Sequence, residues 1–420
     1  MGNEFERALR CRGRCLAAFC LINFFTGALY VWSVFAGPLA ERLASVSGDP
    51  VSAASLAGVF GLATGITPAM MLAGGIVNDR MGPRAILALG GAAIAAGYCL
   101  ASGAESVGAL YGAYGVLVGA GTGLVNGCTI NTAVKFFPER RGFAGGLVTA
   151  CLGIGAAALP FAANALLAAI GIGGTLRAFG IASGAAIIAA ALFTARCPDG
   201  FRGTLAGSEE NAAAPAEKSV NWIGMLKSPT FVPLAVLFVS STTMGLMLLS
   251  SIASIARLQA GFAAGAAAAA VSVISLANTG GRFVSGAASD RIGRVPALAL
   301  ALLLALAGFG LLAAAGPGDA LLFFSGIILI GICFGAFVGI YPGLVADEYG
   351  PKHNSVNFSV MAFGYSIGGF LGPFLLGLAD TAGGRFGAAY GLCAAVAAAG
   401  LAAAFAFTRI KRRGRVPQGA

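Results

Sequence analysis

A single cation interrupts one of the long apolar stretches of this sequence. Arg282 lies within residues 263–288, where no other residue is charged, and eight positions before Asp290. If the stretch is a helix, a rise of about 1.5 Å per residue places Arg282 roughly 12 Å from Asp290 along the helix axis. A guanidinium carries a planar fork of donors that fits a carboxylate. The chemistry that this position predicts is recognition of an anion.

The acidic residues of the chain do not supply an obvious partner for Arg282. All 16 Asp and Glu residues fall in polar segments or at the ends of apolar stretches. A charge at the centre of a membrane span costs about 2.5–3.5 kcal/mol, so it needs a partner or a watery cavity. A small anion from solution would supply the missing charge. The alternative is that Arg282 reaches toward the membrane surface or bonds backbone carbonyls.

Other polar side chains in the apolar stretches could line a cavity with Arg282. They are Tyr30, Trp32, Asn131 and Tyr341. Each also has a structural interpretation, because Tyr and Trp commonly anchor span ends at the membrane surface and amides tie membrane helices together.

The elements that would position these residues are membrane-spanning helices. Of the 420 residues 58% are hydrophobic and 10% are charged, whereas soluble domains carry about 25% charged residues. Twelve apolar runs are each long enough to cross about 30 Å of hydrocarbon. We predict spans at 15–36, 55–77, 85–104, 107–134, 143–170, 176–195, 231–256, 263–288, 296–316, 320–346, 355–379 and 386–408.

The distribution of Lys and Arg predicts the orientation in the membrane. Most of the 26 Lys and Arg residues fall on one side if both termini are cytoplasmic, as the positive-inside rule requires. The basic clusters near both ends are therefore assigned to topology and anionic lipid, not to nucleic acid. We expect a multi-pass protein of a plasma or inner membrane that works as a monomer.

Enzyme chemistry has little support in the sequence. The only histidine, His353, lies in a predicted loop, and no Gly-x-x-x-x-Gly-Lys motif occurs. The nine cysteines lie mostly in or beside apolar spans without metal-ligand spacing, which is typical of buried hydrophobic residues. We expect neither a cofactor nor a metal.

An internal repeat divides the chain. Gly75-Ile-Val-Asn-Asp79-Arg80-Met-Gly82 is matched by Gly286-Ala-Ala-Ser-Asp290-Arg291-Ile-Gly293 at a constant offset of 211 positions. Met71 occupies the position that corresponds to Arg282, so duplication alone does not require a cation there. We predict six-helix bundles at 1–195 and 231–420, joined by a cytoplasmic linker at 196–230. Duplicated six-span units are typical of carriers with a central site.

These repeats resemble the signature of the major facilitator superfamily, Gly-x-x-x-Asp-Arg-x-Gly-Arg between spans two and three. The second copy fits it well, whereas the first has Pro83 before Arg84. The resemblance implies an all-α membrane protein with twelve transmembrane helices in two bundles related by pseudo-two-fold symmetry. We expect the loop charges to act in gating rather than in binding, because interface charges of this kind bias one conformation over another. These residues are Asp79, Arg80, Asp290, Arg291 and Arg294.

Three blocks resemble the oxalate/formate antiporter branch, which is related to the monocarboxylate transporters. They are Tyr30-Val-Trp32-Ser-Val-Phe35-Ala-Gly-Pro38, Lys135-Phe-Phe-Pro138-Glu139-Arg140-Arg141-Gly142 and Tyr341-Pro342-Gly343-Leu-Val-Ala-Asp347.

In that branch an Arg in span eight and a Lys in span eleven act together on oxalate, and Arg282 matches the first. The resemblance places Tyr365 at the Lys position, so a monocarboxylate such as formate, lactate or pyruvate is favoured over oxalate. Monocarboxylate transporters have an Asp where this chain has Asn278, which puts proton coupling of their kind in doubt.

The sequence thus predicts a secondary or facilitative carrier of a small carboxylate that works by alternating access. Two alternatives stay open. The first is an exporter of a neutral or cationic compound in which Arg282 is structural, and the second is a sensor that keeps the fold without transport.

Overall fold

The protein is almost entirely helical in a computed structural model that describes residues 2–48, 50–52, 55–201, 220–378 and 386–413. Eleven helices in these ranges are long and apolar enough to cross a membrane. One of them, α7 (Arg141–Ala191), contains the predicted span 143–170 and residues 176–191 of the next predicted span. The twelve predicted spans are therefore all present as helix. Residues 202–219, the centre of the predicted linker, lie outside the described residues.

A single glycine allows α7 to contain two spans without a loop between them. Gly171 has φ 68° and ψ 178°, so the helix bends sharply there without an intervening loop. A positive φ is readily adopted only by glycine. The bend lies between the predicted spans 143–170 and 176–195, and it separates them as a loop would.

Contacts divide the chain into two compact units, which are described separately. Unit 1 comprises Met1–Glu139, Cys151–Ser219 and Gly350–Ser359, and unit 2 comprises Arg140–Ala150, Val220–Tyr349 and Val360–Ala420. The start of α7, from the first half of the sequence, belongs to unit 2. The start of α13 (Asn354–Leu378), from the second half, belongs to unit 1. The predicted domain limits at 195 and 231 stay a prediction.

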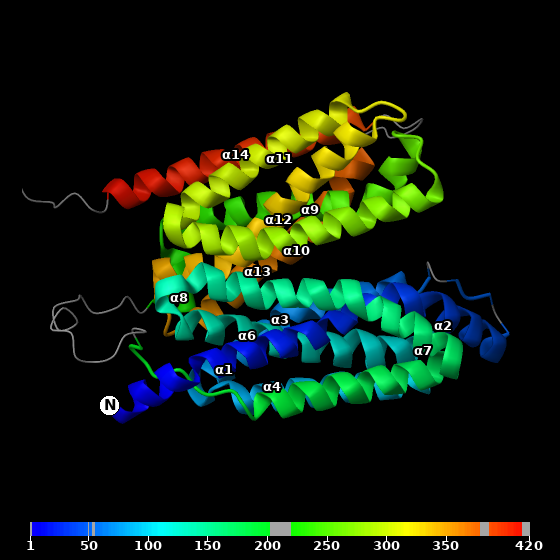
Figure 1. Cartoon of the computed structure of the whole chain (residues 1–420), viewed down its shortest axis with the longest axis horizontal. Coiled ribbons are helices and arrows are strands. Elements are labelled where there is room, and N and C mark those ends of the chain that lie inside the picture. Colours follow the sequence, from blue (N-terminus) through cyan, green and yellow to red (C-terminus); the bar gives the residue numbers. More distant parts are fainter. Residues whose placement is uncertain (1, 49, 53–54, 202–219, 379–385, 414–420) are drawn as a thin grey trace, which may run out of the picture. The chain divides into compact units, whose positions relative to one another are not determined.

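Unit 1 contains the helices of the first half of the chain (Figure 1). Its elements are α1 (Gly2–Thr26), η1 (Gly27–Val31), α2 (Trp32–Ser47), α3 (Ala57–Met81), α4 (Pro83–Ser102), α5 (Val107–Leu110), η2 (Tyr111–Val118), α6 (Gly119–Phe136), η3 (Pro138–Arg140) and most of α7. The helix α6 packs against α1, α3 and α4, so it forms the centre of the unit. Every described residue of α6 except Ala120 and Lys135 is buried.

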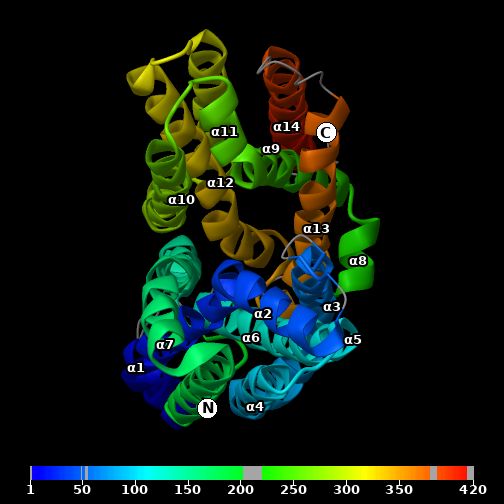
Figure 2. The same ribbon diagram turned by 90° about the vertical axis from the view of Figure 1, so that its right-hand side faces the viewer.

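Unit 2 is built around α12, which contacts α9, α10 and α11, while α14 packs on α9 and α11 (Figure 2). Its elements are α8 (Trp222–Lys227), α9 (Phe231–Leu258), α10 (Ala264–Ile292), α11 (Arg294–Ala314), α12 (Ala320–Tyr349), most of α13 and α14 (Gly387–Arg413).

Large apolar side chains cover the outside of the helices. Phe161 is 79% exposed, Leu321 is 80% exposed and Leu192 is 70% exposed. A water-soluble protein rarely presents so many apolar side chains in continuous surfaces. The chain is therefore a multi-pass integral membrane protein, and the predicted cytoplasmic location of its termini stays a prediction.

Candidate functional site

Arg282 lies in the body of α10 and is held by two uncharged acceptors. Its Nε donates to Asn278 Oδ1 at 2.9 Å, and its Nη1 donates to the Thr149 carbonyl at 3.0 Å. Asn278 is one helical turn earlier on α10, and Thr149 lies in the part of α7 that belongs to unit 2. The two oxygens orient the guanidinium without contributing a formal charge.

The amide of Asn278 is oriented by this contact. Because Oδ1 must face the Arg282 Nε–H, the Nδ2 group points elsewhere, and it is buried with no acceptor among the described residues. A buried donor without a partner is costly, about 1–3 kcal/mol. An oxygen of a bound molecule would relieve that cost.

Three glycines bring neighbouring backbones against Arg282. A Cβ at Gly146 would overlap the Arg282 carbonyl oxygen, and one at Gly335 or Gly339 of α12 would overlap the backbone of Arg282 or Asn278. Membrane helices approach this closely only where small residues meet. The position of the guanidinium is therefore fixed by backbone packing as well as by its hydrogen bonds.

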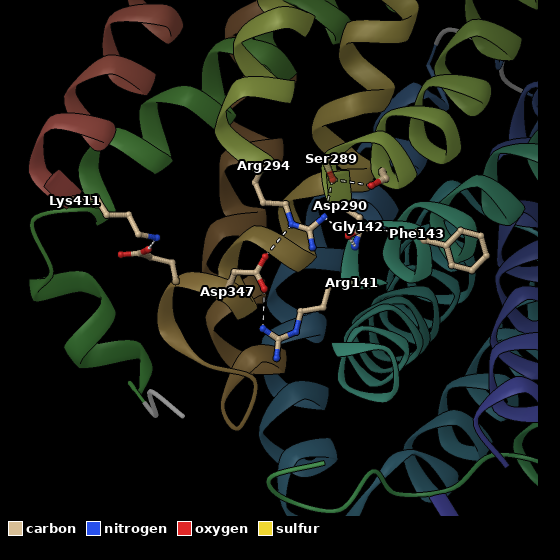
Figure 3. Close-up of polar contacts among 10 residues, drawn as sticks. Arg141, Gly142, Phe143, Ser289, Asp290, Arg294, Asp347 and Lys411 are labelled. Carbon is tan, nitrogen blue, oxygen red and sulfur yellow. Dashed lines mark hydrogen bonds and ion pairs between the residues drawn. The ribbon is translucent and has the colours of Figure 1, made fainter. Parts of the chain in front are cut away.

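Two turns further along α10, Asp290 caps the beginning of α7. Its Oδ1 accepts from the Gly142 backbone N–H at 2.9 Å and its Oδ2 from that of Phe143 at 2.8 Å (Figure 3). A carboxylate at a helix N-terminus satisfies amides that have no partner within the helix and interacts favourably with the helix dipole.

Two arginines share Asp347 beside this cap. Arg294 donates from Nη1 to Asp290 Oδ1 at 2.5 Å and from Nε to Asp347 Oδ2 at 2.9 Å. Arg141 donates to Asp347 Oδ1 at 2.7 Å (Figure 3). The chain of ion pairs links α10, α11, α12 and the start of α7. Arg291, which was predicted with this group, is exposed.

The first copy of the repeat has a different set of contacts. Asp79 pairs with Lys135 of α6 at 2.6 Å, while Arg80 is exposed. Arg84, the basic residue displaced by Pro83, donates to the Thr194 carbonyl at 2.7 Å. Lys135 and Arg141 lie in a block that resembles the antiporter branch, and the structure shows that both form ion pairs.

The remaining predicted residues of unit 2 lie in aromatic surroundings. Tyr341 is fully buried, stacks on Phe337 and donates its hydroxyl to the Leu234 carbonyl at 2.6 Å. Tyr365 is half-buried and stacks on Phe334 with the ring centroids 6.0 Å apart. Of the predicted substrate-binding residues, Asn278 contacts Arg282 directly. Substrate binding by the two tyrosines stays a prediction.

The predicted residues of unit 1 also have packing contacts. Trp32 is buried against Tyr114, with the ring centroids 4.4 Å apart, and Tyr30 is 37% exposed. Asn131 is buried, donates to the Gly127 carbonyl at 2.8 Å and accepts from Asn354 at 2.7 Å. Their part in binding stays a prediction.

Comparison with known proteins places this architecture among carriers. The sequence profile of the Major Facilitator Superfamily matches residues 15–373. The oxalate:formate antiporter of Oxalobacter formigenes is 31% identical over 348 residues, which cover 81% of this chain and 78% of that protein. The uncharacterized transporter YhjX of Escherichia coli is 29% identical over 360 residues, which cover 86% of each chain.

Solved structures agree on the fold. The human organic anion transporter MFSD10 superposes with a TM-score of 0.69 at 15% identity, covering 94% of this chain and 99% of that one. The Escherichia coli fucose:proton symporter FucP gives a TM-score of 0.68 at 15% identity, covering 93% and 98%. At such low identity the likeness concerns the fold alone.

Proposed function

This chain belongs to the major facilitator superfamily of transporters, and on that premise we propose that it carries a small carboxylate by alternating access. The observation that carries the proposal is the guanidinium of Arg282, set in the body of an apolar helix and oriented by uncharged oxygens. The similarity of the chain to a protein named as an oxalate:formate antiporter supports the same class of substrate.

Recognition in this proposal uses two kinds of donor. The guanidinium attracts the carboxylate and bonds it directly, because charge-assisted hydrogen bonds are stronger than neutral ones. The buried Nδ2 of Asn278 donates to a second oxygen of the substrate. The substrate would then bond to both groups at once and supply the acceptor that Nδ2 lacks.

A monocarboxylate is the preferred substrate in this proposal. Arg282 supplies one positive charge, and Tyr365 supplies a hydroxyl at the position where a second cation would be needed to balance a dicarboxylate. Formate, lactate and pyruvate each carry one negative charge, whereas a second carboxylate of oxalate would enter the apolar helices uncompensated.

Gating is assigned to the cap on α7. Residues Arg140–Ala150 pack with unit 2 although the rest of α7 belongs to unit 1. Release of the Gly142 and Phe143 amides from Asp290 would free this segment from α10, and the same segment supplies the Thr149 carbonyl to Arg282. Undocking would therefore change the surroundings of the substrate site.

Counterflow of radiolabelled formate, lactate, pyruvate and oxalate in proteoliposomes tests the proposal. Arg282→Gln should lower carboxylate uptake about 10- to 100-fold, because a hydrogen bond to a charged group contributes about 1.5–3 kcal/mol. The matched control is Arg257→Gln, which removes the same charge from an exposed position at the end of α9. Uptake by Arg282→Gln equal to that of the control would contradict the assignment.

A second candidate function is favoured by the bond from Arg282 to the Thr149 carbonyl. In that case Arg282 ties α10 to α7, and the cargo is neutral or cationic. Arg282→Gln would then lower the thermal stability of the purified protein, while no carboxylate would exchange in wild-type vesicles. Wild-type carboxylate exchange distinguishes the two candidates, and it also excludes a sensor that does not transport.

A further inference from the structure

Unit 2 contains a cavity that lies apart from the proposed substrate site and shares Arg294 and Asp347 with the ion pairs beside the α7 cap. It has a volume of about 530 Å³ and lies where α11 begins and where α12 and α14 end. Arg294, Lys411 and Arg412 contribute its cationic side chains, and Asp347 and Glu348 its acidic ones. The cavity is distinct from Arg282, which does not line it.

The acidic groups of the cavity already have cationic partners. Asp347 is bonded by Arg141 and Arg294, and Glu348 is bonded by Lys411 at 2.7 Å. Arg412 is exposed at the end of α14. The lining itself has three cations and two carboxylates. Arg141 and Asp290, which pair with lining residues, add one charge of each sign, so positive charge exceeds negative charge around the cavity.

The rest of the lining is apolar. Val295, Pro296, Leu344 and Phe407 contribute to it, and Phe407 is 3% exposed with the Lys411 ammonium 5.6 Å above its ring centroid. A free polar anion would find cations here but few further hydrogen-bonding groups. A molecule with an anionic head and an apolar body fits both parts of the lining.

The level of the cavity along the helices indicates that a molecule with an anionic head and an apolar body would come from the lipid bilayer. The spans α11, α12 and α14 all change from apolar to charged residues at this end of unit 2. That is the level at which lipid headgroups lie, and basic pockets between helices at this level bind anionic headgroups.

We propose that this cavity binds an anionic phospholipid. Lys411 and Arg412 contact the phosphate, and Phe407 and Leu344 contact the glycerol and the first carbons of an acyl chain. The site is separate from substrate recognition, so the proposal stands or falls independently of the cargo.

Thermal unfolding of the detergent-purified protein tests the proposal. Phosphatidylglycerol should raise the melting temperature, whereas phosphatidylcholine with the same acyl chains and inorganic phosphate should not. Arg412→Gln should weaken the apparent affinity for phosphatidylglycerol about fivefold, since one basic residue near an anionic lipid surface contributes about 1 kcal/mol. The matched control is Arg409→Gln, on the same helix but outside the cavity lining and stacked on Phe405.

Two further variants keep the test independent of folding. Lys411→Gln alone would leave the carboxylate of Glu348, 7% exposed, without its partner, so Lys411→Gln is combined with Glu348→Gln. Thr408→Trp should fill the cavity and abolish the lipid effect while the protein stays folded. Equal stabilisation by phosphatidylcholine, stabilisation by inorganic phosphate alone, or equal effects of Arg412→Gln and Arg409→Gln would each overturn the proposal.

Discussion

Replacing Asp290 by Asn should loosen the start of α7 from α10. The carboxylate accepts one backbone amide on each oxygen, Gly142 at 2.9 Å and Phe143 at 2.8 Å. Asparagine retains one acceptor oxygen and loses the negative charge. One of the two amides therefore loses its acceptor, and the favourable charge at the helix N-terminus disappears.

The magnitude follows from these two losses. A capping hydrogen bond contributes about 1 kcal/mol, and a negative charge at a helix N-terminus contributes about 0.3–1 kcal/mol. Together they amount to roughly 1.3–2 kcal/mol, which is about a 10- to 30-fold shift in the equilibrium for opening. The variant also loses the ion pair of Asp290 with Arg294, but that pair joins α10 to α11 and does not hold the start of α7. The bond of Arg294 to Asp347 persists.

Hydrogen exchange measured by mass spectrometry reports this equilibrium directly. Amides in residues 142–149 should exchange about 10- to 30-fold faster in Asp290→Asn, while those of α9 keep their wild-type rates. Asp319→Asn is the matched control, because Asp319 also accepts a backbone amide, that of Gly316 at 2.8 Å, in an exposed loop. Unchanged exchange in residues 142–149, or equal acceleration there by the control, would refute the role given to the cap.

Three more results are expected. Gly339→Ala should lower transport and destabilise the protein by about 1–3 kcal/mol, because the new Cβ would overlap the Arg282 carbonyl oxygen. Gly310→Ala is the control, since a Cβ at Gly310 meets open space. Thermal unfolding and uptake are measured for both variants. Tyr365→Lys should improve competition by oxalate in counterflow, and an unchanged substrate profile would place Tyr365 away from the substrate. Burial raises the pKa of the Cys197 thiol to about 12. Maleimide should therefore label Cys197 slowly at pH 8 and rapidly only after denaturation, which peptide mapping would measure. Fast labelling in the folded protein would contradict the burial of this thiol.

Hydrophobic runs and the internal repeat were sufficient to predict every membrane span. The apolar stretches are local features, and a helix in lipid must satisfy its own backbone hydrogen bonds, so length and composition predict each helix without knowledge of its neighbours. The structure differs from the predicted spans inside α7, where a bend at Gly171 takes the place of a loop between two spans. Arg282 and Asp290 were also recognisable, since a charge in an apolar run and a repeated motif are both visible in the sequence.

Which charges meet was decided by the tertiary structure. Arg141 and Asp347 are far apart in the chain and pair only because the start of α7 packs with α12 in unit 2. Lys135 reaches Asp79 in the same way, through the packing of α3 on α6. Composition and periodicity describe single helices, whereas an ion pair depends on the rotation and register of two helices at once. The helices and the cation Arg282 could therefore be predicted from the sequence. The contacts that hold Arg282 in place depend on helix packing and could not.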